Sequence, residues 1–451
     1  MKKNNSTIAK LGLGKTGISV AKYLKNKNKE FVVYDTRENL EMTREIEKYV
    51  HKKNILLGKL NKSIVEKHEN FIVSPGIKLE KEFTNEILKK NKSITTDIDI
   101  FNKESSCKII CITGSNGKTT VTSMLEHILV GMGKKAKAGG NIGLPALELL
   151  YQDYEFCILE LSSFQLERTQ KIKSSSSVIT NIVPDHLDRH STFENYVKIK
   201  HKIFKHSDNI IINREDENVK KQNFSYRYTF GYSKPKNNKE IGILLEDGKK
   251  YISHGKNKIL SEDEIKLIGS HNIINVCTSL CVILSLGLNI HEAANQIKNF
   301  QPIEHRMESF YNDGKISWIN DSKATNVAST VFAVNSLEEK IILILGGKSK
   351  EDDYGNLNGV INSKVHQVII YGESRDLLSK QINAKNKPIE VINVKDAVEV
   401  AKKIAKKSMS SGESICILLS PACSSYDMFK SYEERGLYFK KCVMNSENKF
   451  L

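Results

Sequence analysis

Hydrophobic and polar residues alternate in short blocks along the chain. Compact apolar runs occur at 7–11, 31–34, 71–73, 108–112, 156–161, 178–183, 210–213, 341–345, 365–371, 389–391 and 415–419. Apolar residues at helical spacing follow several of these runs, for example at 119–130 and 193–204. Because such runs fit buried strands and such spacing fits amphipathic helices, the pattern predicts an α/β fold with parallel sheets.

The same logic predicts further elements and a division into domains. Helices are expected at 40–50, at 273–286 after the polar stretch Gly269–Asn272, and in a stretch that ends at 334. A hairpin is expected around Asp247-Gly248 and a linker at 95–106. We expect three domains at 1–97, 98–301 and 302–451, because a chain of 451 residues exceeds what one core usually supports.

Composition excludes some classes of protein. Hydrophobic residues make up 39% of the chain and no apolar run approaches the roughly 18 residues of a membrane span. The N-terminus shows no apolar stretch typical of a secretory signal, and the eight cysteines lack any Cys-x-x-Cys pair. We therefore expect a cytoplasmic protein with reduced cysteines. The formal charge of +16 comes from scattered lysines, which does not favour nucleic-acid binding.

The stretch KIICITGSNGKTT at 108–120 carries the clearest chemistry. A buried strand breaks into the turn Gly114-Ser115-Asn116-Gly117, and Lys118, Thr119 and Thr120 then open a helix. Turn amides and a helix N-terminus favour an anion, a lysine suits terminal phosphates, and a threonine hydroxyl suits Mg²⁺. The turn therefore predicts ATP binding. Ile112 stands where the general phosphate-binding loop has its first glycine, so this loop is a shortened variant.

A second glycine-rich turn follows the first strand. Residues 12–17, GLGKTG, match G-x-G-x-x-G, and Asp35 ends the second strand with Arg37 close behind it. An anionic ligand at the helix N-terminus is one interpretation, and a tight turn without a ligand is the other. The acid beside an arginine favours a site, and Ser74-Pro75-Gly76 adds another turn at a strand end.

Polar residues gather where the central strands end. Glu160 closes the run 156–161 and His186 follows the run 178–183, so the two side chains could complete a Mg²⁺ site at one sheet edge. Asn141, Ser163 and Gln165 lie in neighbouring polar turns. Lys200 on the helix at 193–204 would pass for a solvated charge by spacing alone.

The last third of the chain repeats this arrangement. Asp321, Lys323 and Thr325 follow one strand, glycines and lysines follow the strand at 341–345, and the stretch 420–436 follows the last strand. Each turn alone fits ordinary loop chemistry. Three polar turns at strand ends in one domain favour a second ligand site.

Taken together, the motifs resemble a known family. TGSNGKTT, GGNIGLP, LELSSFQLE, DHLDRH, EHRME, NDSKATN and SPACSSYDMFKSYEERG, in this order, resemble the Mur ligases of bacterial peptidoglycan synthesis. The resemblance covers nearly the whole chain. It implies a Rossmann-like N-terminal domain for a UDP-linked substrate, a central P-loop ATPase-like domain, and a Rossmann-like C-terminal domain for an amino acid.

The resemblance also implies roles for individual residues. The nucleotide and its Mg²⁺ ions are expected at Gly114, Ser115, Asn116, Gly117, Lys118, Thr119, Thr120, Asn272, Arg306 and Asp321, with Glu160 and His186 as metal ligands. Lys200, four residues after Tyr196, is expected to be carbamylated and to act near a second Mg²⁺. Substrate contacts are expected at Thr16, Asp35, Thr36, Arg37, Gly76, Asn141, Ser163, Gln165, Lys323, Thr325, Lys350, Ser425 and Tyr432. Lys348 is an alternative to Lys350, and Lys15 stands where a hydrophobic residue is frequent.

The implied activity is ATP-dependent addition of D-glutamate to UDP-N-acetylmuramoyl-L-alanine through an acyl phosphate, by a monomer that closes around a hinge near 298–304. Lys118, Glu160, His186, Lys200 and Arg306 would be the catalytic residues. A carboxylate near the amino acid or His186 would deprotonate the amine. Two alternatives remain: a related ligase for another amino acid, including folylpolyglutamate synthase, and a nucleotide switch or NAD-dependent binding protein built on the two glycine-rich turns.

Overall fold

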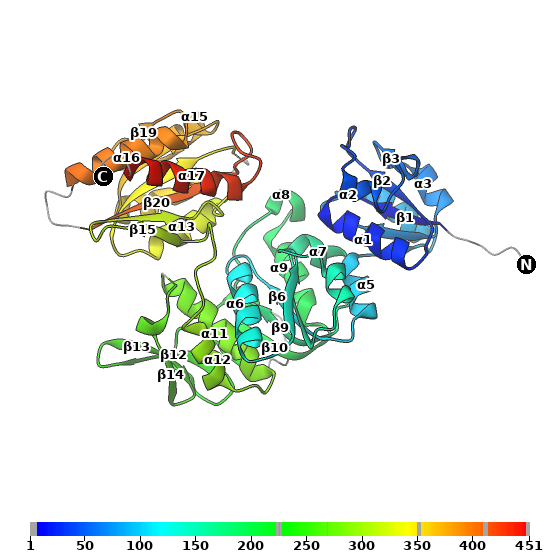
Figure 1. Cartoon of the computed structure of the whole chain (residues 1–451), viewed down its shortest axis with the longest axis horizontal. Coiled ribbons are helices and arrows are strands. Elements are labelled where there is room, and N and C mark those ends of the chain that lie inside the picture. The colour runs from blue at the N-terminus through cyan, green and yellow to red at the C-terminus, as the bar shows by residue number, and fades with distance from the viewer. Residues whose placement is uncertain are drawn as a thin grey trace, which may run out of the picture. The chain divides into compact units, whose positions relative to one another are not determined.

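The chain forms two compact units in a computed structural model that describes residues 7–221, 225, 228–267, 269–349, 353–408 and 414–447. The first unit comprises Met1–Glu262 and Ile274–Ile297, and the second comprises Asp263–Ile273 and Lys298–Leu451. Two sheets lie in the first unit and one in the second (Figure 1). Each sheet is covered by helices, which confirms the predicted α/β class.

The first sheet is parallel and five-stranded, in the order β3-β2-β1-β4-β5. Its strands are β1 (Ile8–Leu11), β2 (Phe31–Asp35), β3 (Ile55–Leu57), β4 (Asn70–Val73) and β5 (Ser93–Thr95), and its helices are α1 (Lys15–Asn26), α2 (Arg44–Glu47), η1 (Lys52–Asn54), α3 (Lys62–Lys67) and α4 (Lys81–Lys89). Apolar residues of α3 and α4 cover one face. The helix expected at 40–50 is reduced to the single turn α2.

The second sheet has nine strands in the order β14-β13-β12-β11-β10-β9-β6-β8-β7. They are β6 (Lys108–Thr113), β7 (Ala136–Gly140), β8 (Phe156–Glu160), β9 (Ser174–Ile179), β10 (Ser207–Asn213), β11 (Tyr228–Phe230), β12 (Glu240–Glu246), β13 (Lys249–His254) and β14 (Asn257–Ser261). The predicted hairpin is confirmed between β12 and β13, where Asp247 and Gly248 have φ of 51° and 73°. Parallel pairing from β7 to β12 aligns the carboxyl ends of β6, β7 and β8.

Helices around this sheet correct one expectation. They are α5 (Asp97–Glu104), α6 (Lys118–Gly131), η2 (Ala146–Tyr151), α7 (Ser163–Arg168), α8 (Leu187–His190), α9 (Phe193–His201), η3 (Lys202–Phe204), α10 (Glu217–Lys220), η4 (Glu262–Glu264), α11 (Ser270–Ser285) and α12 (Ile290–Ile297). The linker predicted at 95–106 is wrong, because α5 fills most of it behind a capping box of Thr96 and Asp99.

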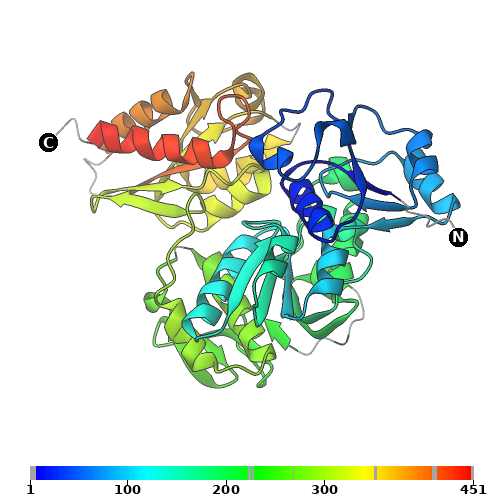
Figure 2. The same cartoon turned by 45° about the vertical axis from the view of Figure 1, so that its right-hand side comes forward.

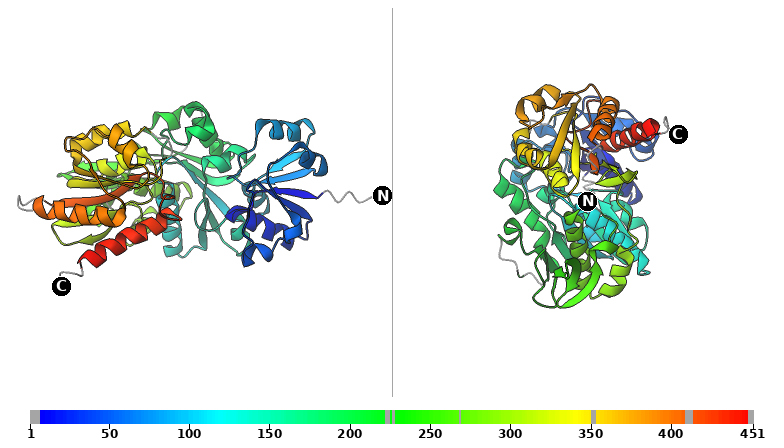
Figure 3. Two further views of the ribbon diagram at one scale, coloured as in Figure 1. Left: turned by 90° about the horizontal axis from the view of Figure 1, so that it is seen from above. Right: turned by 90° about the vertical axis from the view of Figure 1, so that its left-hand side faces the viewer.

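The second unit contains a six-stranded sheet in the order β15-β16-β20-β17-β18-β19. Its elements are β15 (Glu308–Asn312), β16 (Ile316–Asn320), α13 (Val327–Asn335), β17 (Lys340–Gly346), η5 (Tyr354–Leu357), α14 (Asn358–Lys364), β18 (Val365–Tyr371), α15 (Arg375–Gln381), β19 (Ile389–Glu390), α16 (Val394–Ser408), β20 (Ile415–Ala422) and α17 (Tyr432–Glu447). Helices α16 and α17 lie side by side on one face (Figures 2 and 3), and α13, α14 and α15 pack on the other.

In the described part of the chain, no helix combines the length and the apolar character that crossing a membrane requires.

Candidate active site

The turn between β6 and α6 has the shape of an anion cradle. Gly114 and Gly117 have φ of 149° and 80°, so both lie in the left-handed region that glycine tolerates. A Cβ at Gly114 would come within 1.9 Å of Thr180 Oγ1, and one at Gly117 within 2.5 Å of Asn275 Oδ1. The backbone therefore packs closely against its neighbours, and the first turn of α6 lies at the carboxyl end of the sheet, where a helix N-terminus favours an anion.

Asn181 supports this turn from the segment that follows β9, the strand next to β6. Its side-chain oxygen accepts from the amide of Asn116 at 3.0 Å, and its backbone oxygen accepts from the amide of Ser115 at 2.9 Å. Sequence analysis missed Asn181, because no local motif marks it. It follows the serine-rich strand β9, whose position was also mispredicted.

Two lysines converge on the same turn. The Lys118 ammonium donates to the carbonyls of Gly114 and Ser115, each at 2.8 Å, and the Lys200 ammonium donates to the carbonyl of Gly114 at 2.7 Å. Lys200 is 1% exposed. Burial holds the pKa of Lys200 well below its ordinary value, and the neighbouring Lys118 lowers it further. Lys200 is therefore not the solvated charge that its spacing suggests.

Tyr196 fixes the position of Lys200. The Lys200 ammonium lies 4.6 Å from the centre of the Tyr196 ring, and the Tyr196 hydroxyl is 3.0 Å from Ser115 Oγ. Burial raises the pKa of Tyr196, so the hydroxyl stays neutral. Helix α9 thus presents an aromatic ring and a lysine together to the underside of the turn.

Glu160 joins three strand ends. The carboxylate is 1% exposed, and its Oε2 accepts from the Thr119 hydroxyl at 2.7 Å while its Oε1 accepts from the Asn141 amide at 2.7 Å. The register between β7 and β8 pairs Gly140 with Glu160, which places the Asn141 loop beside the carboxylate. An acid and a hydroxyl with oxygen donors at one sheet edge fit a hard divalent cation.

His186 lies outside the Glu160 hydrogen bonds. It has φ of 53°, its ring packs 4.9 Å from that of Phe164, and its Nε2 is 3.6 Å from Asp185 Oδ2. Within the described residues, no three His, Cys, Asp or Glu side chains gather closely enough to hold a metal on their own. A metal at Glu160 would therefore need phosphate oxygens, water or Thr119 to complete its ligands.

Ser163 and Gln165 take different positions at the start of α7. Gln165 is used within the protein, because its side chain closes a capping box with Ser162. Ser163 Oγ is 2.9 Å from Nε2 of His190, which stacks on Phe164 with ring centres 5.5 Å apart. His190 was part of the DHLDRH motif but was not singled out, and the structure shows that it orients the Ser163 hydroxyl.

In the N-terminal sheet, Asp35 anchors the first glycine turn. Its carboxylate accepts from the Leu13 amide at 2.8 Å and from Nε and Nη2 of Arg37, each at 2.8 Å. Burial favours the neutral acid, but the hydrogen bonds from Arg37 and the two amides outweigh it and lower the pKa of Asp35. Thr16 lies in the first turn of α1, and Gly76 lies in the exposed turn after β4.

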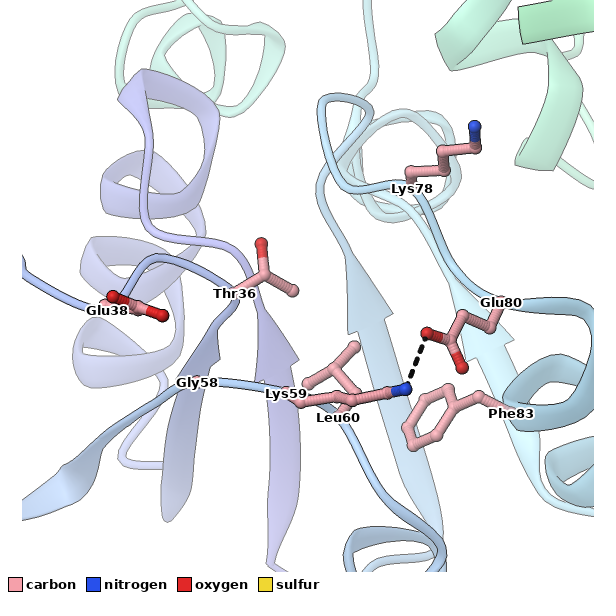
Figure 4. Close-up of a pocket in the computed structure, with 8 residues that line it drawn as sticks. All are labelled: Thr36, Glu38, Gly58, Lys59, Leu60, Lys78, Glu80 and Phe83. Carbon is pink, nitrogen blue, oxygen red and sulfur yellow. Dashed lines mark ion pairs between the residues drawn. The ribbon is translucent and has the colours of Figure 1, made fainter.

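A cavity of about 310 Å³ opens beside Thr36. Figure 4 shows its lining: Thr36, Glu38, Gly58, Lys59, Leu60, Lys78, Glu80 and Phe83. Lys59 and Glu80 form an ion pair of 3.3 Å across it. The cavity lies at the carboxyl ends of β2, β3 and β4, where ligands of parallel sheets gather.

The second unit brings its predicted residues to one end of the sheet. Asp321 accepts from Ser420 Oγ at 2.8 Å and from the Met307 amide at 3.3 Å, and burial raises its pKa to about 7. Arg306 lies near enough to oppose that rise. The Lys323 ammonium lies 3.9 Å from the centre of the Tyr432 ring. Thr325 follows on the same loop.

Arg435 holds the turns of this unit together, and sequence analysis missed it. The guanidinium is fully buried and donates to Ser322 Oγ, to Ser322 O and to the carbonyls of Cys423 and Ser424 at 2.8–3.2 Å. Lys348 and Ser424 exchange backbone hydrogen bonds beside it, and Ser425 is buried next to them. Lys350 lies outside the described residues. Asn272 is buried at the start of α11.

Family models match most of the chain. Residues 6–96 match the MurD-like N-terminal domain of Mur ligases, residues 112–283 the Mur ligase middle domain, and residues 305–423 the glutamate ligase domain of Mur ligases.

Individual proteins match over nearly their full length. The UDP-N-acetylmuramoylalanine--D-glutamate ligase of Pseudomonas aeruginosa is 33% identical over 439 residues, which is 96% of each chain. That of Haemophilus influenzae is 34% identical over 438 residues, or 96% of this chain and 97% of the relative. The structure of MurF ligase from Thermotoga maritima in complex with ADP aligns with a TM-score of 0.60 at 14% identity, covering 99% of this chain and all of the other. At that identity the likeness concerns the fold alone.

Proposed function

Because this chain belongs to the Mur ligase family, we propose that it catalyses the ATP-dependent joining of D-glutamate to UDP-N-acetylmuramoyl-L-alanine in peptidoglycan precursor synthesis. The observation that carries this function is the 33–34% identity over nearly the whole chain to ligases of that name. The activity is that of a carboxylate–amine ligase, and ATP is its energy source. The cytoplasm, where nucleotide-linked precursors and ATP occur, is the proposed location.

The reaction proceeds in two steps. The alanine carboxylate attacks the γ-phosphorus of ATP, which forms an acyl phosphate and releases ADP, and the D-glutamate amine then attacks the acyl carbon and releases phosphate. Both steps concentrate negative charge near the phosphates. A carboxylate nucleophile needs no base, whereas the amine must lose a proton, either to a carboxylate near the amino acid or to His186 when His186 binds no metal.

The residues at the end of β6 fit the nucleotide. The amides that open α6 bind the phosphates, together with the turn Gly114, Ser115, Asn116 and Gly117. Lys118 releases its two carbonyl contacts and donates to the β- and γ-phosphates. Thr120 is largely buried and supports the helix start. Arg306, Asp321 and Asn272 of the second unit are proposed nucleotide contacts.

Oxygen donors at Thr119 and Glu160 fit Mg²⁺, and His186 is the proposed ligand of a second ion. A bound Mg²⁺ would neutralise charge on the phosphates. Lys200 fits the proposed carbamylation, since burial beside Lys118 disfavours a second ammonium and a carbamate would give Lys118 an anionic partner.

Residues that follow the strands of the three sheets are the proposed contacts of the two substrates. Thr16, Asp35, Thr36, Arg37 and Gly76 are the proposed contacts of the UDP group, beside the cavity at Thr36. Asn141, Ser163 and Gln165 are the proposed contacts of its muramoyl-alanine end. Lys323, Thr325, Ser425, Tyr432 and either Lys348 or Lys350 are the proposed contacts of D-glutamate.

Amino-acid-dependent release of ADP tests this function. Purified protein is incubated with ATP, Mg²⁺ and UDP-N-acetylmuramoyl-L-alanine, and D-glutamate is compared with L-glutamate, L-alanine and meso-diaminopimelate. We expect ADP and phosphate with D-glutamate only. Release with one of the other amino acids instead would assign the chain to a different ligase of the same family.

A further inference from the structure

A lysine is buried in the middle of the N-terminal sheet. Lys10 lies on β1, has 0% exposure, and pairs in register with Ile72 of β4. Its side chain lies on the same face of β1 as Ile8, which packs against an apolar cluster that includes Val20 and Leu24 of α1, where an apolar residue would pack at lower cost. Burying an ammonium is unfavourable unless its hydrogen bonds are used, so the partners of Lys10 indicate what it does.

Those partners lie at the carboxyl end of the sheet. The ammonium donates to Ser74 Oγ at 2.6 Å, to Leu11 O at 2.8 Å and to Ile72 O at 3.5 Å. Ser74 in turn donates to the carbonyl of Gly12 at 3.2 Å. One chain of hydrogen bonds therefore runs from Lys10 to the turn after β4 and then to the glycine turn after β1.

The two turns meet with little space between them. A Cβ at Gly12 would come within 2.8 Å of Ile77 Cγ1 and 3.0 Å of Ser74 Cβ, and one at Gly17 within 2.2 Å of Gly12 O. Arg168 of α7 holds the same turn from the other side by donating to Ile77 O at 2.6 Å. A small shift of Ser74 would therefore move both turns.

The charges around Lys10 do not form a simple ion pair. Asp97 at the start of α5 is 2% exposed, and neither of its carboxylate oxygens has a hydrogen-bond partner within the described residues. Asp35 at the end of β2 also acts on Lys10 electrostatically. Burial lowers the pKa of Lys10 to about 7 and raises that of Asp97 to about 6. The hydrogen bonds of the ammonium go to the turns and not to a carboxylate.

We propose that Lys10 is a positioning residue for the UDP-linked substrate: through Ser74 it fixes the two glycine turns of the N-terminal sheet relative to each other. The inference rests on the proposed function of those turns. Thr16 and Gly76, which are proposed to contact the substrate, lie on the two segments that Lys10 connects. Lys10 itself lies beneath them.

Binding and kinetics of three variants test this role. Lys10→Met removes the ammonium at similar volume, Ser74→Ala removes its acceptor, and Lys10→Met/Ser74→Ala removes both. Lys92→Met is the matched control, because Lys92 is also largely buried and donates to Val65 O and His68 O, but it lies at the amino ends of β4 and β5, away from the glycine turns. The dissociation constant and KM for UDP-N-acetylmuramoyl-L-alanine, the KM for ATP and kcat are measured for each.

We expect Lys10→Met and Ser74→Ala each to raise both constants for the UDP-linked substrate about tenfold, the size of one lost charged hydrogen bond. The double variant should be no weaker than Lys10→Met, because both changes break the same link. The KM for ATP and kcat should stay within about twofold, and Lys92→Met should behave as wild type.

The outcomes separate the two proposals. If wild-type protein does not bind or use the UDP-linked substrate, the proposed function fails. If wild type binds it and folded Lys10→Met or Ser74→Ala binds equally well, only the role of Lys10 fails. If Lys10→Met does not fold because Asp97 is left alone, Lys10→Met/Asp97→Asn removes both buried charges, and wild-type affinity in that variant would overturn the inference.

Discussion

The hydroxyl of Thr119 donates a 2.7 Å hydrogen bond to Oε2 of Glu160 and so joins the first turn of α6 to the end of β8. Asn141 donates to the other carboxylate oxygen from the loop after β7. One buried carboxylate thus connects three neighbouring strand ends at the position where the terminal phosphates are proposed to bind. Its hydrogen bonds orient the carboxylate, and its charge is available to a cation.

Glu160→Gln separates these two contributions. The amide keeps the shape and one hydrogen bond but loses the charge, so we expect ADP release to fall at least about 100-fold while the fold is retained. The measurement is initial rate against Mg²⁺ concentration. Glu126→Gln on α6, where the half-buried Glu126 pairs with Lys137, is the control and should keep wild-type rates. A Glu160→Gln enzyme with normal rates would exclude the proposed metal role.

Lys118→Ala tests the phosphate turn. We expect turnover to be lost, because Lys118, whose ammonium lies at the Gly114 and Ser115 carbonyls, is the proposed donor to the β- and γ-phosphates. Binding of UDP-N-acetylmuramoyl-L-alanine, measured by calorimetry, should stay within about twofold of wild type because its nucleotide is proposed to bind the other sheet. Exposed Lys198→Ala is the control. Loss of both turnover and binding of the UDP-linked substrate, together with a lowered melting temperature, would indicate a folding defect instead.

Local pattern was sufficient where one segment determines its own structure. The strand, glycine turn and helix at 108–130 were expected, and the structure has β6 at Lys108–Thr113 and α6 at Lys118–Gly131. The linker expected at 95–106 failed, although Thr96 and Asp99 spell a capping box. That signal was outweighed by the polar residues around it, of which Lys103 and Glu104 are exposed in α5 whereas Asp97 is buried.

Long-range contacts explain most other differences. A strand was expected at 178–183, but β9 runs from Ser174 to Ile179 because buried serines satisfy one another, as in the pairs Ser174–Ser177 and Ser176–Ser285. No local pattern announces that a serine will meet a partner more than 100 residues away. The burial of Lys10 and Arg435 was not predicted for the same reason, because a charged residue in a sequence is expected to face solvent.

Asp321 should make the stability of the second unit depend on pH. Burial raises its pKa from 3.8 to about 7, so the folded protein holds a proton that the unfolded chain releases. This stabilisation is complete below about pH 4 and is lost as the pH rises through about 7, at about 1.4 kcal/mol per pH unit between the two pKa values. Urea unfolding between pH 5 and 8 should show the decline in wild type and a flatter profile in Asp321→Asn. Parallel pH profiles of stability in wild type and Asp321→Asn would contradict the raised pKa of Asp321.

Arg435 should determine whether the turns of the second unit stay together. Arg435→Met removes the guanidinium hydrogen bonds to the buried carbonyls of Ser322, Cys423 and Ser424, so we expect the free energy of unfolding to fall by about 3 kcal/mol. Urea unfolding measures this. Arg435→Lys keeps the charge but not the planar fork of donors, so its free energy of unfolding should lie between those of wild type and Arg435→Met. Arg375→Met, which removes a contact of 3.4 Å to Val391 O, should cost less. If Arg435→Met were as stable as Arg375→Met, the three turns would have to be held by their own backbone pairing, such as that between Lys348 and Ser424.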